Sequence, residues 1–392
     1  MSPTTTTRKN PPPLHTYKIA YITALPKEQT AVLATFDSIH HHQFPTPLTD
    51  KNTYTLGCIS HHNIVLLCLP TMGTIAAASA VTSLLHTFPS IDFVILVGVG
   101  GGIPSNGVRL GDVVVSVPVS GGYGGVVAWD RGMLAEDGVV VVDQNKGGAG
   151  RRLKEGLGLG VRRVLDGLKH DGDSMVVRKG INGCLDDVEE RFPRLVPRWT
   201  RCDGLKDPVL RRWRVCSYLW LVGWVVWKMI MASVVELLGL WGFEMVGSEF
   251  DGEMGKGKMN RARAREKKER NIRVHYGLIA SGNFVVKDAR ARDALSNGFE
   301  DGILCVEMEA AGVMDQIPCI VVRGICDYAD SGKNKDWQEY AAMVAAAYAR
   351  VLLESLSPED VDMVDDTGDI PGGSQELEES GTLVGLNLGI QL

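Results

Sequence analysis

Two glutamates interrupt an apolar stretch in the second half of the chain. Glu307 and Glu309 lie in LCVEMEAAGVM (304–314), where every other residue is hydrophobic, alanine or glycine. Burying an unpaired carboxylate costs several kcal/mol, so buried acids normally have a partner. The pattern indicates either that both acids meet water at the end of an element, or that a ligand arrives to be hydrogen-bonded.

Three further segments place charged or polar residues at the ends of expected strands, and two of them also contain glycine. They are TALPKE (23–28), GVGGGIPSNGVRLGD (98–112) and IASGNFVVKD (279–288), and the glutamate stretch continues into VVRGICDYAD (321–330). Ligands of α/β proteins bind at such strand ends. The glycines Gly98, Gly100 and Gly101 let a ligand approach the backbone and meet its N–H donors. The cluster is neither a P-loop nor a complete dinucleotide fingerprint, because it lacks GK[ST] and has Ile103 in place of the third glycine.

The elements that must position these segments alternate along the chain. We expect buried strands at 17–25, 63–69, 93–97, 112–119, 274–282 and 319–324, and helices at 26–36, 73–88, from 287 onward and at 336–356. This alternation is typical of an α/β sheet with helices on both faces.

Composition narrows the class of protein. The chain has 392 residues, 45% of them apolar, and a net charge of −6, which gives no support for a nucleic-acid partner. Its eight cysteines form no CxxC pair, so they indicate free thiols and not a disulfide framework or a zinc site. The first residues contain no apolar signal core, and we expect a cytoplasmic or nuclear protein.

The alternation of expected strands and helices is interrupted between residues 125 and 274. We expect a disordered leader at 1–16, one domain formed by 17–125 and 274–356, an irregular insertion at 126–273 and an acidic disordered tail at 357–392. In the insertion, the Trp-rich segment 213–247 has a longest charge-free run of 13 residues, shorter than the ~20 of a membrane span. For this segment we favour the interpretation that it is translated non-coding sequence over the alternatives of a membrane span or a buried helix. The basic run 256–273 favours a solvated connector over a nucleic-acid patch.

Four motifs in order resemble the purine and uridine phosphorylase superfamily, which includes the adenosylhomocysteine/methylthioadenosine nucleosidases, and most of all its fungal-type branch. They are the Gly-rich loop ending in GDVVVS, the SGN turn, VEME and VRGICDYAD, and the resemblance covers 16–125 and 274–356. It implies a single three-layer α/β domain with a mixed, barrel-like central sheet, assembled as a homo-oligomer. It also implies a purine nucleoside or nucleotide as partner, phosphate as a second candidate partner, and neither cofactor nor metal.

The resemblance also assigns roles to individual residues. Glu309 would accept hydrogen bonds from the ribose hydroxyls, which suits the two oxygens of a carboxylate, and Met308 would pack against the sugar. Asp327 matches the acid that protonates the departing purine at N7, and Glu28 matches the glutamate that activates water. Arg323, four residues before Asp327, would help Glu28 to position the nucleophile, although a cation beside Asp327 would oppose an acid role.

Each role has a structural alternative. Glu309 and Glu28 could be ordinary acids at helix starts, and Arg323 could form a structural pair with Asp327 or orient another carboxylate. The base-stacking aromatic of the nucleosidases aligns with Val285, so Phe284 beside it is the second candidate for that contact.

Two departures from the family weaken phosphate binding. Leu96 and Val99 stand where family phosphorylases have an arginine and a serine or threonine, and neither side chain can bind an oxyanion. We therefore expect hydrolysis of the N-glycosidic bond. The alternatives are a phosphorylase that uses the Gly98–Gly102 backbone with Arg109 or a partner's arginine, and a non-catalytic nucleotide-binding or scaffold module. His40–His42 and His61–His62 are expected to be surface histidines.

Overall fold

The computed structural model describes residues 12–41, 44–119, 124–135, 138–141, 157–170, 175–195, 199, 207, 271–362 and 385–386. The predictions for the Trp-rich segment 213–247 and for residues 1–11 lie outside these ranges, as does all but 271–273 of the basic run. The described elements belong to one compact unit, formed by residues 1–205 and 272–392.

The main sheet has 11 strands, in the path order β10-β6-β13-β5-β1-β4-β3-β2 with β11, β12 and β7 branching from it. Its strands are β1 (Tyr17–Thr23), β2 (Ser38–His40), β3 (Tyr54–Ile59), β4 (His62–Cys68), β5 (Phe93–Gly102), β6 (Val113–Ser116), β7 (Val126–Ala128), β10 (Val274–Gly277), β11 (Ile279–Ser281), β12 (Cys305–Glu307) and β13 (Cys319–Asp327). A small second sheet contains β8 (Gly132–Ala135), β9 (Gly138–Val141) and β14 (Gly385–Leu386).

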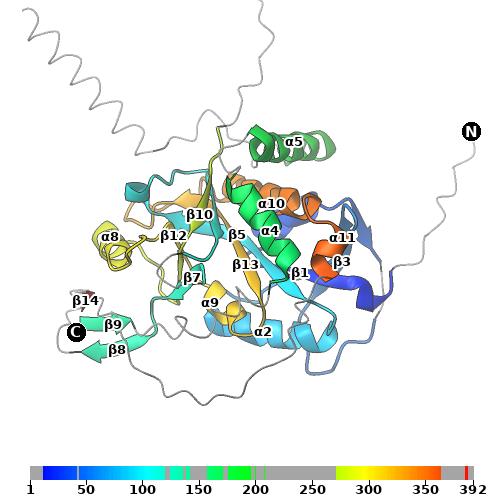
Figure 1. Cartoon of the computed structure of the whole chain (residues 1–392), viewed down its shortest axis with the longest axis horizontal. Coiled ribbons are helices and arrows are strands. Elements are labelled where there is room, and N and C mark those ends of the chain that lie inside the picture. The colour runs from blue at the N-terminus through cyan, green and yellow to red at the C-terminus, as the bar shows by residue number, and fades with distance from the viewer. Residues whose placement is uncertain are drawn as a thin grey trace, which may run out of the picture. The chain divides into compact units, whose positions relative to one another are not determined.

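The helices are α1 (Pro26–Ala34), α2 (Thr74–Thr87), α4 (Leu159–His170), α5 (Met175–Arg191), α8 (Ala289–Asn297), α9 (Ala310–Met314), α10 (Gln338–Glu354) and α11 (Pro358–Asp362), with 3-10 turns η1 (Leu14–Thr16) and η2 (Pro104–Asn106). The buried helix α10 packs on β13 and β5 and also contacts α1 and α5. Figure 1 shows α10 and α4 in front of the sheet, with α2 and α9 side by side below it. The predicted mixed α/β fold is confirmed.

The centre of the sheet is parallel and sets the relative height of the site residues. β1, β4, β5 and β13 run parallel, whereas β6 pairs antiparallel with β13. Arg323 lies opposite Gly98, and Asp327 lies opposite Gly101. Because the carboxyl ends of these strands meet at one edge, TALPKE, the glycine cluster and RGICDYAD converge there.

The strand expected to end at Val97 continues through the glycine cluster to Gly102. The last residues of β5 pair antiparallel with β12, so the sheet branches at this point. A side chain at Gly102 would meet Ile325 at 2.7 Å, so only glycine allows so close an approach between these strands. The glycines are therefore part of the sheet, and the expected loop begins after them.

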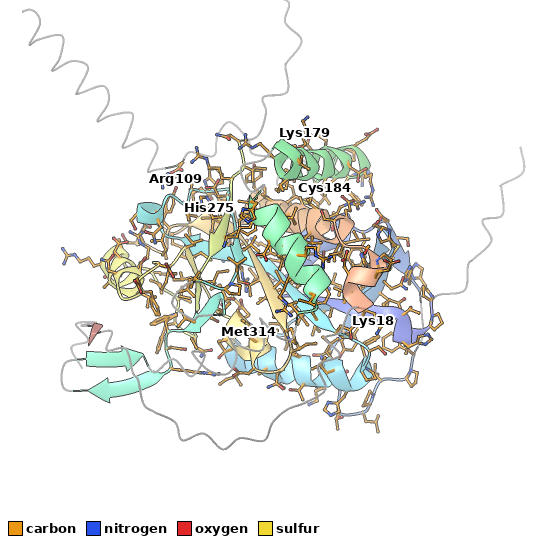
Figure 2. All side chains as sticks on the ribbon, viewed as in Figure 1. Lys18, Arg109, Lys179, Cys184, His275 and Met314 are labelled. Atoms are coloured by element: carbon orange, nitrogen blue, oxygen red, sulfur yellow. The ribbon has the colours of Figure 1, made fainter. Side chains whose placement is uncertain are left out.

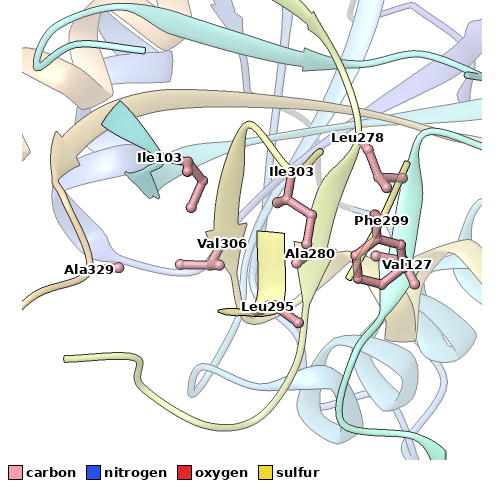
Figure 3. Packing of buried hydrophobic residues seen from close by; sticks show 9 residues of the cluster. All are labelled: Ile103, Val127, Leu278, Ala280, Leu295, Phe299, Ile303, Val306 and Ala329. Carbon is pink, nitrogen blue, oxygen red and sulfur yellow. The ribbon is translucent and has the colours of Figure 1, made fainter. Parts of the chain in front are cut away.

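A second, smaller core lies under this branch (Figure 3). Its buried members come from β7, β11, β12, α8, the residues beside them and the segments that follow β5 and β13: Ile103, Val127, Leu278, Ala280, Leu295, Phe299, Ile303, Val306 and Ala329. This packing fixes β11 and β12, which carry the SGN turn and the VEME segment.

Several sequence expectations differ from the structure. The predicted strand 274–282 is divided into β10, which pairs with β6, and β11, which pairs with β12 and β7. The insertion expected to be irregular contains the regular helices α4 and α5, and the expected disordered tail contains α11 and β14. His62 is buried, not on the surface, and its Nε2 lies 3.0 Å from the Leu356 carbonyl oxygen after α10.

Candidate active site

The two glutamates are buried around one arginine. Arg323 Nη2 contacts Glu307 Oε2 closely and lies 3.1 Å from Glu309 Oε2. The three side chains are 1% (Arg323), 0% (Glu307) and 5% (Glu309) exposed. The strand β13 carries Arg323, and β12 runs into α9 beside it, so the sheet brings all three together. Arg323 is therefore the partner that the two buried carboxylates require.

Glu307, for which no role was predicted, caps the start of α9. Its carboxylate accepts hydrogen bonds from the N–H groups of Glu309 at 3.1 Å and Ala310 at 3.1 Å. These N–H groups have no partner within the helix, and a carboxylate there is favoured by the helix dipole. Glu307 thus holds Arg323 and the turn that presents Glu309.

The carboxylate of Glu309 makes fewer hydrogen bonds than that of Glu307. Glu309 stands at the N-cap position of α9, and its Oε1 accepts a hydrogen bond from Gly73 N at 3.4 Å. Burial raises the pKa of Glu309 to about 7, against the lowering effect of Arg323 and with a further increase from Glu307 and Glu28. Glu309 thus lies at the start of α9, as the structural alternative predicted, but its carboxylate is buried and caps no N–H of that helix.

Glu28 is held by three backbone donors. Its Oε2 accepts from Ala24 N at 2.9 Å and Leu25 N at 2.8 Å, and its Oε1 accepts from Val99 N at 2.8 Å. Pro26 begins α1 and places Glu28 in the first turn, facing β5. Burial raises the pKa of Glu28, although Arg323 and the three N–H groups oppose this effect. A carboxylate has about four acceptor positions, so Oε1 retains capacity for one more donor.

The glycines of β5 make room for these charges. A side chain at Gly98 would collide with Arg323 Nη1 and approach Glu28 Oε1 to 2.8 Å. At Gly101 it would lie 3.0 Å from Asp327 Oδ1, and at Gly100 it would lie 3.3 Å from the Val306 carbonyl oxygen. The cluster therefore lets charged side chains pack against the strand.

Asp327 ends β13 and pairs with a different cation from the one expected. Its Oδ2 lies 3.3 Å from Lys333 Nζ, and its Oδ1 accepts from Ala329 N at 2.9 Å. Asp327 is 3% exposed, whereas Lys333 is 27% exposed. The alternative of a structural Arg323–Asp327 pair is wrong, because the guanidinium turns toward the glutamates. Nothing in the sequence around Lys333, six residues after Asp327, indicated this contact.

The sequence profile of the phosphorylase superfamily matches residues 18–126 and 256–357 of this chain. These ranges include every candidate residue above. The chain belongs to the phosphorylase superfamily. It is also 37% identical over 348 residues to a nucleotide-binding leucine-rich repeat (NLR)-like protein of Hyaloscypha variabilis, covering 88% of this chain and 30% of that protein.

Two shorter similarities involve nucleosidases. A 5′-methylthioadenosine/S-adenosylhomocysteine nucleosidase of Mycobacterium bovis is 35% identical over 92 residues, which are 22% of this chain and 35% of that protein. A death domain-containing ATP nucleosidase of Amphimedon queenslandica is 32% identical over 113 residues, which are 27% of this chain and 18% of that protein. This superfamily member thus spans only about a third or less of the length of these three relatives.

The candidate base-side residues of this phosphorylase superfamily member are exposed. Phe284 is 69% and Val285 49% exposed, and both follow the SGN turn after β11. The Phe284 ring lies 6.0 Å from the Trp129 ring, centroid to centroid, whereas Met308 between the glutamates is half-buried. The structure thus places Phe284 and Val285 on a surface, outside the buried charge cluster.

The anion-binding candidates of the phosphorylase alternative are already engaged. The N–H of Val99, expected to be free for an oxyanion, donates to Glu28, and its carbonyl oxygen accepts from Arg323 at 3.4 Å. Arg109 Nη1 donates to the Pro104 and Val108 carbonyl oxygens at 2.9 Å each. Figure 2 labels the position of Arg109 on the ribbon. Leu96 is fully buried in β5. The Val99 N–H and the Leu96 side chain therefore offer no free donor to phosphate, and the Nη1 group of Arg109 is already occupied.

Within the described residues, no group of three or more His, Cys, Asp or Glu side chains is arranged to hold a metal ion. None of the helices described is both long and apolar enough to cross a membrane.

Proposed function

We propose that this chain hydrolyses the N-glycosidic bond of a purine nucleoside or nucleotide. The observation that carries the proposal is the arrangement of Glu28, Glu309 and Arg323, buried together at the strand edge that Asp327 also occupies. Buried carboxylates with raised pKa values, gathered beside a cation at a strand edge, are typical of functional sites.

Glu309 would bind the sugar. Its Oε1 has only one long hydrogen bond, to Gly73 N at 3.4 Å, so it retains capacity for ribose hydroxyls. A carboxylate accepts two neighbouring hydroxyls with charge-assisted strength. Arg323 holds the other oxygen and so fixes the carboxylate plane.

Glu28 would activate water. Its free acceptor position on Oε1 can hold one water, and burial makes its carboxylate a stronger base. As the bond from C1′ to the base breaks, the water oxygen bonds to C1′ and its proton passes to Glu28. The two glutamates also place negative charge where the ribose becomes positive in the transition state.

Asp327 would assist the departing base. A purine leaves with negative charge that is relieved when N7 receives a proton or a hydrogen bond. The positive charge of Lys333, 3.3 Å from this carboxylate, can stabilise the negative charge that develops on the base. A pyrimidine has no N7, so a carboxyl group at the position of Asp327 favours a purine substrate.

Water is favoured over phosphate because the Val99 N–H already donates to Glu28 and the buried Leu96 side chain has no donor. The relatives are named for different 5′ groups, a thioether in one case and the triphosphate of ATP in another. Both classes therefore belong among the substrates to be tested.

The experiment measures base release from adenosine, inosine, methylthioadenosine and ATP, each with and without phosphate. Release without phosphate is expected, with losses of about 10²–10⁴-fold in Glu28→Gln and Asp327→Asn while nucleoside binding is retained. Asp336→Asn, an exposed carboxylate before α10, is the matched control and should keep full activity.

Three outcomes would overturn parts of the proposal. Strict dependence on phosphate would establish a phosphorylase. Nucleoside binding by calorimetry without base release would indicate a binding module. Full activity in Asp327→Asn would refute its acid role.

A further inference from the structure

The turn Ser281–Gly282–Asn283 joins several elements around Glu309, yet the proposed chemistry gives it no task. Ser281 Oγ accepts a hydrogen bond from Ala311 N at 3.0 Å, in the first turn of α9. Asn283 Oδ1 accepts from Thr74 N at 3.1 Å, at the start of α2. One turn therefore bonds the starts of both helices that border Glu309.

Both polar atoms of the Asn283 amide are engaged. Thr74 Oγ1 donates to Asn283 Oδ1 at 3.1 Å and accepts from Nδ2 at 2.9 Å. On the other side, Asp130 Oδ2 accepts from Asn283 N at 2.7 Å and from Nδ2 at 2.9 Å. The amide is thus fixed between the loop after β7 and α2, which leaves it one orientation.

The same amide lies against the peptide that contacts Glu309. Gly73 has φ +116°, a conformation that residues other than glycine rarely adopt, and its N–H is directed to Glu309 Oε1 at 3.4 Å. A side chain at Gly73 would meet Asn283 Oδ1 at 3.2 Å. The position of Gly73 therefore depends on Thr74, its neighbour in the chain, and on the amide that holds Thr74.

We propose that Asn283 is a positioning residue: through Thr74 it fixes the Gly73 peptide so that the Gly73 N–H stays on Glu309. Asp130 completes this arrangement by orienting Asn283. The inference rests on the proposed function where it names ribose as the ligand of Glu309, whereas the contact itself is independent of any activity.

The electrostatics of Glu309 provide a direct measure of this contact. Charged groups from three elements face it: Arg323 of β13, Glu307 of β12 and Glu28 of α1. Burial raises its pKa to about 7, Arg323 lowers it, the two glutamates raise it, and the Gly73 hydrogen bond lowers it. Loss of the Gly73 bond therefore moves the pKa of Glu309 upward, because the ionised form loses a donor.

The test is a ¹³C NMR titration of the Glu309 carboxyl group in the full chain, assigned with Glu309→Gln. In Asn283→Ala the midpoint should rise by about half a pH unit or more relative to the unsubstituted protein. The KM of the nucleoside that the protein cleaves should rise about tenfold, with a smaller change in kcat. The acidic limb of kcat/KM should move to higher pH together with the midpoint.

Asn106→Ala is the matched control. Asn106 Nδ2 donates to Ser296 Oγ at 3.0 Å and to the Ile303 carbonyl oxygen at 2.7 Å, away from Glu309. This variant loses an equivalent amide and should leave the Glu309 midpoint unchanged. If Asn283→Ala fails to fold, Thr74→Val takes its place. It removes only the hydroxyl contacts and should give a smaller upward shift.

An unchanged Glu309 midpoint in a folded Asn283→Ala protein would overturn the inference. An equal shift in Asn106→Ala would also overturn it, because general loosening would then explain both. If the unsubstituted protein releases no base from any nucleoside while Asn283→Ala still shifts the midpoint, the positioning role stands and only the proposed function fails.

Discussion

The two sides of the candidate site are built in opposite ways. On the sugar side, Arg323 and its two glutamates are almost completely buried and mutually paired. On the base side, Phe284 and Val285 are 69% and 49% exposed. The proposed sugar side is therefore held by charge pairs within the chain itself, whereas the proposed base side leaves much of its apolar surface open to solvent.

Because of this difference, substitutions on the two sides should affect different properties: folding stability on one side and ligand binding on the other. Charges buried without water depend on one another, so a change on the sugar side acts on folding as well as on binding. Exposed apolar side chains contribute little to folding, so a change on the base side acts on binding alone. Three substitutions test this contrast, and they are given in order of decreasing effect on stability.

Arg323→Met should have the largest effect. It leaves Glu307 and Glu309 buried without their cation, and breaking such a buried pair costs about 3–5 kcal/mol. Urea unfolding at neutral pH measures this loss. The loss should shrink as the pH falls below about 7 and Glu309 becomes protonated, because burial raises the pKa of that group to about 7. Arg323→Lys keeps the charge and should lose less. A loss below about 1 kcal/mol in Arg323→Met would show that the cluster does not depend on its cation.

Gly98→Ala should have an intermediate effect. The added methyl group would collide with Arg323 and approach Glu28 Oε1 to 2.8 Å, and such overpacking costs about 1–3 kcal/mol. Gly183→Ala in α5 is the control, because a side chain there meets nothing within 4 Å. It should stabilise the helix by about 0.5–1 kcal/mol. Equal unfolding midpoints for the two variants would contradict the close packing at Gly98.

Phe284→Ala should have the smallest effect on stability, within about 0.5 kcal/mol, because the ring is 69% exposed. If the ring stacks on the base, KM should rise about tenfold, since base stacking on an aromatic side chain contributes roughly 1–3 kcal/mol. Val285→Ala is the comparison variant, and a larger KM change there would assign the base contact to Val285. An unfolding midpoint that falls as far as in Arg323→Met would remove the contrast between the two sides.

Much of the fold and part of the site could be predicted before the structure. The buried strands and the helices of the two ordered halves follow from their apolar periodicity, and the motif order indicated the superfamily. The sequence analysis left the partner of Arg323 undecided, although the sequence contains one indication of it. Arg323 is the sole cation in the apolar strand β13, and Glu307 and Glu309 are the acids without partners in the neighbouring stretch. Matching them by elimination would have predicted the cluster.

Other contacts carried no local signal. Lys333 reaches Asp327 from a loop, and Asn283 bonds Thr74, which lies 209 residues away in the chain. The glycine cluster was expected to follow a strand, but it continues one, because the charged side chains and Ile325 need the space beside it. Such contacts depend on sheet register, which neighbouring residues in the sequence do not fix.

The sequence by itself determined most elements of the two ordered halves, the superfamily motifs and the residue types available at the strand ends, because periodicity and backbone preference act over a few residues. The tertiary structure decided which charges meet. It paired Arg323 with the glutamates and not with Asp327, engaged the Val99 peptide with Glu28, and brought Asn283 against Gly73. The physical reason is that a buried charge or peptide must be satisfied by whatever the register of the sheet places within hydrogen-bond distance.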